Sequence, residues 1–340
     1  MPNNILKREN NLDLLRIIAT FVVIIDHIGM NDIWRNSSGN LNDVGYIYFI
    51  FSKWGVPLFL MLSGAFILKK KIEPIIFYKK AFKKLGIPLI IFSIIYMIIL
   101  LIKSYHYMGF NISILNAPIV ALLKGEPYYH LWYMFMLIGL YGVVPLLQII
   151  KERLSNKNFN ILTYGMLIWG FLSVWTIHFE VHWSGEFLAY IGYFLLGYKI
   201  KNELNKKNPF KYFILGSLFL TINYFLYTIL ENHLNIDILI KLFVHRLSLF
   251  NMIASTCIFI GFCNLKINKN MFFMAEKTYL IYLFHAIFIG IIIKFLEIYE
   301  YKGLNLLDEV IIPIIACIVY ILSHIASILY EKCEGLFKYH

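Results

Sequence analysis

About ten apolar runs follow one another along this chain, each close to the ~20 residues that a helix needs to cross a bilayer. Of the 340 residues, 60% are hydrophobic and only 15% are charged, which is too apolar for a soluble domain of this length. We therefore predict an all-α integral membrane protein with about ten transmembrane helices, formed by a single domain over 1–340. The predicted spans are 12–30, 44–68, 85–102, 131–150, 159–177, 186–198, 210–230, 247–265, 278–297 and 308–330.

The positive charges indicate how these helices cross the membrane. Most of the 31 Lys and Arg lie in alternate loops and near the two ends of the chain. Because loops rich in Lys and Arg stay in the cytoplasm, this distribution predicts an even number of spans with both termini cytoplasmic. The net charge of +11 therefore reflects the Lys and Arg that keep alternate loops in the cytoplasm. We expect these positive charges to contact membrane lipid, and we expect no nucleic acid as a partner.

The first run carries two ionisable side chains on one face. Arg16 and His27 are eleven positions apart, which at about 100° per residue returns to nearly the same side of a helix, roughly 16 Å along its axis. An arginine deep in a lipid-spanning helix costs about 2.5–3.5 kcal/mol, so it usually faces a protein interior or an aqueous cavity. We therefore predict that 12–30 lines a polar cavity.

Two simpler interpretations of this run need no function. Arg16 could reach the inner headgroups of the membrane while His27 reaches the outer ones. Asp13, one turn before Arg16, could also neutralise the arginine in a structural ion pair.

A stretch rich in lysine, 69–84, follows the second run. Within it, Lys79, Lys80, Lys83 and Lys84 have the spacing of one side of a helix at the membrane surface. Such a patch could bind the phosphates of a nucleotide-like ligand. The alternative is that this inner loop only meets anionic lipid, as any cytoplasmic loop does.

Two further histidines lie in or beside apolar runs. His130 opens the fourth run and shares the predicted outer leaflet with His27. His285 lies inside the ninth run, where a buried imidazole needs a hydrogen-bond partner. The partner of His285 could belong to a neighbouring helix or to a substrate.

Four side chains are candidates for cavity or substrate contacts: Ser63, Trp132, His285 and Lys53. The alternative is helix packing for Ser63, which precedes Gly64. Trp132 also suits the aromatic belt at the membrane interface, and Lys53 suits the same interface.

Several kinds of chemical site are absent from the sequence. The four cysteines show neither CxxC nor Cys/His metal-ligand spacing, so we predict no metal site and no disulfide framework. There is no Walker loop, dinucleotide fingerprint, serine-hydrolase elbow or zinc-protease helix. ATP-driven transport is therefore disfavoured, and we expect no tightly bound cofactor.

Five segments, taken in order, resemble the acyltransferase 3 superfamily of membrane enzymes, which acylate bacterial surface glycans and related acceptors. They are Arg16 with His27, 55–64 (GVPLFLMLSG), 130–133 (HLWY), 190–198 (YIGYFLLGY) and 279–285 (YLIYLFH). Because the segments extend from the first to the ninth predicted span, the resemblance covers nearly the whole chain. It includes the membrane domain of VanT-type serine racemases, although we expect neither a racemase domain nor an extracellular hydrolase-like domain here.

The resemblance implies a multi-pass enzyme of the bacterial cytoplasmic membrane. Such an enzyme takes an acyl group, usually acetyl, from cytoplasmic acyl-CoA and transfers it to a hydroxyl of an envelope glycan or lipid-linked saccharide at the outer face. It implies that His27 is essential and that Arg16 belongs to the same motif. An Arg-x-x-Arg-like element of the family corresponds to Lys80 and Lys83, where lysine keeps the charge but not the bidentate fork. The resemblance leaves the acceptor, the acyl chain length and the oligomeric state open.

The chemistry of acyl transfer agrees with these roles. An acetyl thioester is already activated, so transfer needs a base for the acceptor hydroxyl and donors for the developing oxyanion. We expect His27 to deprotonate the acceptor, or to carry the acyl group itself, while His130 or Tyr282 donates a hydrogen bond to the oxyanion. Acetyl-CoA, the expected donor, would contact Arg16 and the four lysines of 79–84.

Two alternatives from other functional classes remain open. A transmembrane polar stripe also suits a transporter or flippase for a polysaccharide intermediate or a small polar solute such as serine. A membrane scaffold with structural histidines is the third possibility. Acyl-CoA discriminates between them, because an enzyme consumes it, a transporter moves a solute without it, and a scaffold does neither.

Overall fold

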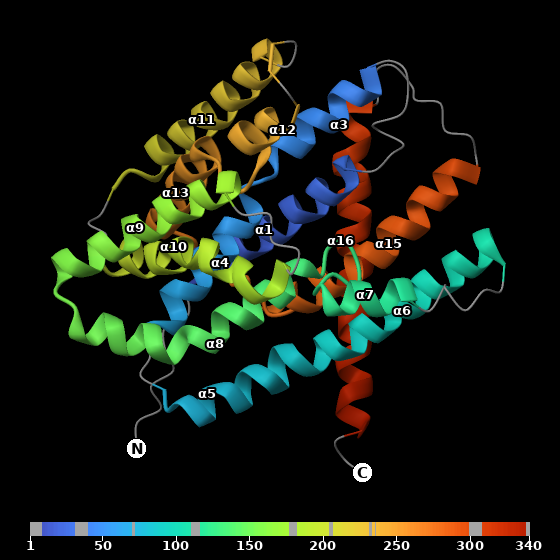
Figure 1. Cartoon of the computed structure of the whole chain (residues 1–340), viewed down its shortest axis with the longest axis horizontal. Helices are drawn as coiled ribbons and strands as arrows, with labels where there is room; N and C mark the ends of the chain where they lie inside the picture. The colour runs from blue at the N-terminus through green and yellow to red at the C-terminus, as the bar shows by residue number, and fades with distance from the viewer. Residues whose placement is uncertain are drawn as a thin grey trace. The chain divides into compact units, whose positions relative to one another are not determined.

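The computed structural model describes residues 9–30, 40–69, 72–109, 116–176, 182–203, 207–230, 233–234, 236–298 and 308–337. Every regular element within these ranges is a helix (Figure 1). The chain divides into two compact units, the first formed by 1–62 and 203–340 and the second by 63–202. Helix α4 (Gly55–Ile67) contributes its first half to one unit and its second half to the other.

The first unit is assembled around its N-terminal helix. This helix is α1 (Asn10–Gly29), and the elements that follow it in the unit are α3 (Asn40–Phe51), α11 (Pro209–Leu230), α12 (Ile236–Leu239), the π-helix η3 (Ile240–Val244), α13 (Leu249–Asn264), α14 (Phe272–Ala275), α15 (Thr278–Ile298) and α16 (Asp308–Phe337). Helix α1 packs against α3, α13, α14, α15 and α16. All of these helices except α14 are labelled in Figure 1. Ile24 and Ile28 of α1 join a buried apolar cluster with Ile281 and Ile289 of α15 and Ile315 of α16. The helix that carries Arg16 and His27 is therefore surrounded by other helices of this unit.

The second unit begins with the end of α4 and a long basic helix. Its elements are α5 (Pro74–Ala81), the π-helix η1 (Phe82–Gly86), α6 (Ile87–Met108), α7 (Asn116–Leu123), α8 (Trp132–Arg153), α9 (Asn156–Thr176) and α10 (His182–Glu203). The first three of these form one continuous helical segment. Pro74 starts it, at a position where the missing N–H of proline costs nothing.

This continuity corrects the predicted start of the third span, which the sequence places at residue 85, after a separate helix at the membrane surface. Residues 70 and 71 lie outside the described ranges, but from Pro74 onward the chain is helical into α6. The spacing argument for the lysines is correct, because all four are exposed on this helix. They are part of a helical extension of the third span.

Seven described helical segments are long and apolar enough to cross a membrane: Ile47–Ile67, Pro74–His106, Trp132–Arg153, Pro209–Leu230, Lys241–Asn264, Thr278–Ile298 and Val310–Cys333. Each overlaps a predicted span, and Pro74–His106 extends beyond the predicted 85–102 at both ends. The predicted spans 12–30, 159–177 and 186–198 correspond to α1, α9 and α10, which are helical but fall outside this group. Helix α1 contains three charged residues, Asp13, Arg16 and Asp26, within its 20 positions. The chain is thus an all-helical multi-pass membrane protein, and the count of ten spans stays a prediction.

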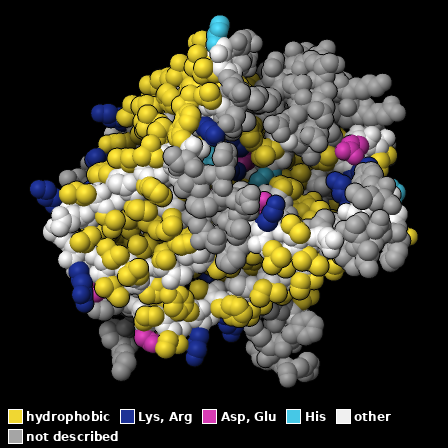
Figure 2. All heavy atoms as spheres, in the orientation of Figure 1, with side chains coloured by type: hydrophobic (Ala, Val, Ile, Leu, Met, Phe, Trp, Pro, Cys, Tyr) yellow, Lys and Arg dark blue, Asp and Glu magenta, His cyan; other side chains and the backbone are white. Residues whose placement is uncertain are grey.

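Apolar side chains cover the outer faces of these helices. Figure 2 shows hydrophobic side chains spread over much of the described surface on one face of the molecule. On α16, the exposed side chains repeat every three or four residues: Ile314, Ile318, Ile321, Ile325 and Leu329. An apolar stripe of this kind is costly in water and is the surface that lipid tails cover.

Gly64 lets α4 and α10 approach closely within the second unit. A Cβ at this position would lie 1.8 Å from the carbonyl oxygen of Phe194. Backbone atoms cannot move aside as a flexible side chain can. The interpretation of the pair at 63–64 as a helix-packing point is therefore confirmed for the glycine.

We expect Gly64→Ala to lower the stability of the protein by about 1–3 kcal/mol or more, because the added methyl forces α4 away from α10. The measurement is the thermal unfolding midpoint in detergent micelles. Gly165→Ala in α9 is the matched control, since nothing lies within 4 Å of a Cβ there. Identical midpoints for Gly64→Ala and the wild type would contradict the close approach.

Candidate functional site

The C-terminal end of α1 carries two adjacent buried ionisable residues. Asp26 is 3% exposed and His27 is 6% exposed. Because successive residues point about 100° apart around a helix, the two side chains contact different neighbours. Asp26 pairs with two basic side chains in a cluster of charges, and the ring of His27 lies beside that of a second histidine.

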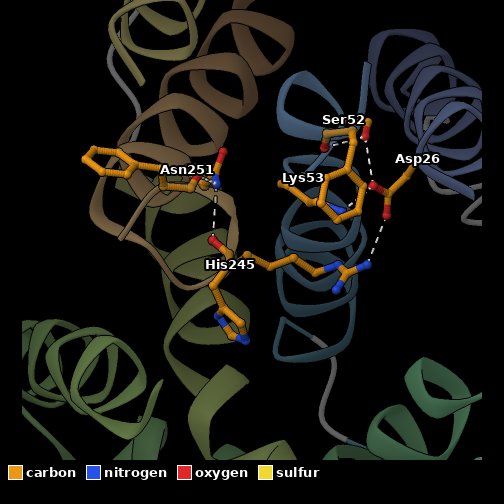
Figure 3. Close-up of polar contacts among 8 residues, drawn as sticks. Asp26, Ser52, Lys53, His245 and Asn251 are labelled. Atoms are coloured by element: carbon orange, nitrogen blue, oxygen red, sulfur yellow. Dashed lines mark hydrogen bonds and ion pairs between the residues drawn. The ribbon is translucent and has the colours of Figure 1, made fainter. Parts of the chain in front are cut away.

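Asp26 accepts hydrogen bonds from three side chains (Figure 3). Ser52 Oγ lies 2.9 Å from Oδ1, Lys53 Nζ lies 2.5 Å from the same oxygen, and Arg246 Nη2 lies 3.0 Å from Oδ2. Lys53 is as deeply buried as Asp26. A buried carboxylate is tolerated when its charge is matched and its oxygens are hydrogen-bonded, and both conditions hold here.

The junction between α3 and α4 brings Lys53 to α1. The ammonium of Lys53 lies 3.1 Å from the centroid of the Phe49 ring, a cation–π contact that shields it further. Gly55 starts α4 so close to α1 that a Cβ would lie 2.9 Å from Val23 Cγ2 and 3.2 Å from the carbonyl oxygen of Ala19. The absence of a side chain at Gly55 therefore allows the lysine to reach Asp26.

Arg246 comes from the turn between η3 and α13, and Asn251 holds this turn in place. Asn251 Nδ2 donates to the carbonyl oxygens of Phe243 at 3.0 Å and His245 at 3.1 Å (Figure 3). Because Asn251 is fully buried and its amide binds two carbonyls of the segment that leads into Arg246, the backbone just before Arg246 is fixed. The guanidinium is thereby held against Asp26.

His27 lies beside His285 of α15. The two ring centroids are 5.2 Å apart and the rings are inclined by 30°. His285 is fully buried, and its Nδ1 forms a hydrogen bond with the carbonyl oxygen of Tyr282. Since a carbonyl oxygen can only accept, Nδ1 carries the proton and Nε2 keeps a lone pair. Three residues singled out from the sequence, His27, Tyr282 and His285, therefore come together in the first unit.

Arg16 lies on the same helix, nearer its start. Its Nη1 is 3.5 Å from Asp13 Oδ1, and its side chain is 29% exposed. The structural ion pair that the sequence offered as an alternative is therefore present. This pair leaves part of the guanidinium accessible.

His130 belongs to the second unit, where tyrosines surround it. It is fully buried, and its ring centroid lies 4.8 Å from that of Tyr96, 5.7 Å from Tyr128 and 5.4 Å from Tyr129. Burial raises the pKa of the Tyr128 hydroxyl above its ordinary value. His130 thus lies in an aromatic environment, and its role stays a prediction.

The other predicted site residues of the second unit are spread over several helices. Trp132 starts α8 and packs 6.1 Å from the ring of Tyr190. Ser63 lies on α4. Four exposed lysines lie on α5 and η1: Lys79, Lys80, Lys83 and Lys84.

Sequence reasoning missed Asp26, although a signal was present. An aspartate inside an apolar run needs a counter-ion, and it directly precedes His27. The sequence predicts Lys53 as a cavity residue, while Arg246 lies directly before the predicted span 247–265. Pairing the acid with these two bases was not possible from sequence, because 220 positions separate Asp26 from Arg246.

Comparison with known proteins gives one match. The model of a family described as an acyltransferase domain matches residues 9–331. Searches of curated proteins and of solved structures find no match. The matched range includes α1, α15 and most of α16, together with all helices of the second unit.

Proposed function

Because the chain belongs to the acyltransferase 3 family, we propose that it transfers an acyl group, expected to be acetyl, from acyl-CoA to a hydroxyl of an envelope glycan or lipid-linked saccharide. Its family and its apolar helices make it a multi-pass membrane acyltransferase. The proposal goes beyond this family assignment in three respects: the acyl group is acetyl, the donor is acyl-CoA, and the acceptor is a glycan or saccharide hydroxyl. The observation that carries it is the buried pair of His27 and His285 next to a fixed charge cluster.

In the proposed reaction His27 is the base. It takes the proton of the acceptor hydroxyl while the hydroxyl oxygen attacks the thioester carbonyl. The Tyr282 hydroxyl is the proposed donor to the resulting oxyanion, since Tyr282 is buried and its ring lies 5.3 Å from that of His285. Collapse of the intermediate forms the ester C–O bond and breaks the C–S bond, and the proton passes from His27 to the leaving thiolate.

The direct test is transfer of label by the purified protein in lipid vesicles. Acetyl-CoA labelled in the acetyl group is supplied together with a crude envelope extract as acceptor. Label that moves into the extract supports the proposal and identifies the acceptor. Label that stays on CoA, with a protein shown to be folded, contradicts it and favours a transporter.

The exposed lysines of α5 and η1 are the proposed contacts for the phosphates of the donor. Changing Lys80 and Lys83 together to glutamine is expected to raise the KM for acetyl-CoA several-fold and leave kcat unchanged, because the charges bind the phosphates of the donor and take no part in the chemical step. Lys103→Gln, an exposed lysine near the end of α6, is the control. An unchanged KM would make these lysines a topology signal only.

A further inference from the structure

Helix α16 carries hydrogen-bonding side chains on its buried side. Tyr320, Ser323 and Ser327 are 7%, 0% and 0% exposed, and His324 follows Ser323. These positions are three or four residues apart, so they form one stripe along about two turns. The isoleucines and Leu329 described above occupy the exposed side of the same helix. The polar stripe therefore faces the interior of the first unit.

Three atoms of this stripe are buried without a partner. Within the described ranges, the Tyr320 hydroxyl, Ser323 Oγ and His324 Nδ1 find no hydrogen bond. A buried polar atom without a hydrogen bond is destabilising, so native proteins rarely keep several together. Ser327 is different, because its Oγ donates to the carbonyl oxygen of His324 at 2.6 Å.

Aromatic rings of two other helices pack against the stripe. The Tyr320 ring lies 6.5 Å from that of Phe21 of α1, and the His324 ring lies 5.2 Å from that of Phe273 of α14. Tyr320 is also the last residue of α16 in the apolar cluster shared with α1 and α15. The stripe thus begins where this apolar cluster ends.

The opposite end of the stripe is charged. Glu331, about 16 Å along α16 from Tyr320, pairs with Lys277, which also lies 3.2 Å from Glu276. Burial alone lowers the pKa of Lys277, but its hydrogen bonds to the two carboxylates raise it overall. Lys277 precedes α15 in a segment that the lysine distribution predicts to be cytoplasmic. The stripe therefore points from the predicted cytoplasmic side toward the middle of the first unit.

We propose that Tyr320, Ser323 and His324 bind the amide groups of the pantetheine arm of the acyl donor, an inference that rests on the proposed function. A secondary amide has one N–H donor and one carbonyl acceptor. Hydroxyl groups of tyrosine and serine donate to the carbonyl, and a lone pair on the imidazole accepts from the N–H. The arm is uncharged, so it matches a stripe of neutral groups better than the nucleotide end of the donor does.

The test compares two donors that share the reacting thioester. Acetyl-CoA carries the amides, and S-ethyl thioacetate carries none. Ser323→Ala and Tyr320→Phe are each expected to lower kcat/KM for acetyl-CoA about three- to tenfold, the effect of one lost hydrogen bond, and to leave kcat/KM for S-ethyl thioacetate unchanged. Ser327→Ala is the matched control, because it also removes a serine hydroxyl from the buried side of α16. The Ser327 hydroxyl already has a partner within the helix, so its loss should leave kcat/KM unchanged for both donors.

The outcomes separate this inference from the proposed function. An equal loss with both donors, or no loss with either, would overturn the amide site, and no loss is the result expected if the stripe holds ordered water only. If the wild type uses neither donor, the proposed function fails. Calorimetric titration with pantetheine then tests the stripe alone: binding that Ser323→Ala weakens and Ser327→Ala does not supports it, whereas no binding overturns it.

Discussion

Replacing His27 with alanine is expected to lower kcat for acetyl transfer by about 10²–10⁴-fold, the usual cost of removing a general base. The imidazole is buried beside His285 and the charge cluster of Asp26, so no solvent group can take its place easily. The measurement is the initial rate with labelled acetyl-CoA in vesicles, at saturating donor. A thermal midpoint close to that of the wild type shows that the variant is folded.

The control for this prediction is His233→Ala. His233 is an exposed histidine of the same unit, between α11 and α12. Its removal should leave the rate unchanged. Turnover by His27→Ala within about twofold of the wild type would refute the role of His27 as base.

Replacing Asp26 with asparagine is expected to reduce the free energy of unfolding by about 3–5 kcal/mol. The substitution keeps the shape of the side chain but leaves Lys53 and Arg246 without the carboxylate that matches their charge. The free energy of unfolding is measured by denaturant titration in detergent micelles. Because the cost arises from an unmatched buried cation, a second change, Lys53→Met, should recover part of it.

Glu297→Gln is the matched control for this charge removal. Glu297 pairs with Lys294 on α15, but both side chains are about half exposed, so the loss should stay within about 1 kcal/mol. Equal losses for Asp26→Asn and Glu297→Gln would show that the cluster around Asp26 is hydrated. A double variant with Lys53→Met that is less stable than Asp26→Asn alone would show that the lysine contributes by packing.

The features that the sequence predicted correctly depend on neighbours along the chain. Apolar runs of helix length predict helices at 12–30 and 278–297, and α1 and α15 lie there. The spacing of Asp13 and Arg16 makes an ion pair one alternative for the arginine, because three positions nearly complete one turn, and this pair is present. These signals need no knowledge of the tertiary fold.

The features that it missed depend on contacts between distant segments. The sequence predicts both His27 and His285 as site residues. The contact between their rings depends on the packing of α1 against α15, which the sequence does not indicate. The lysines at 79–84 favour a separate helix at the membrane surface, so the sequence places the start of the third span at residue 85 and not at Pro74. Nothing between Pro74 and Gly86 stops a helix, and the wider turn of η1 carries the helix past Gly86 to Pro88, whose missing N–H a regular turn does not accommodate.

The two basic partners of Asp26 are synthesised at different times, because they come from distant parts of the chain. As the chain emerges from the ribosome, Lys53 follows Asp26 after 27 residues, whereas Arg246 follows after 220. A carboxylate in the membrane needs a positive charge as soon as it inserts. Lys53 is therefore the early counter-ion of the first helix, and Arg246 joins it only after the second unit has been made. The charge cluster beside His27 is therefore complete only after residue 246 has been synthesised.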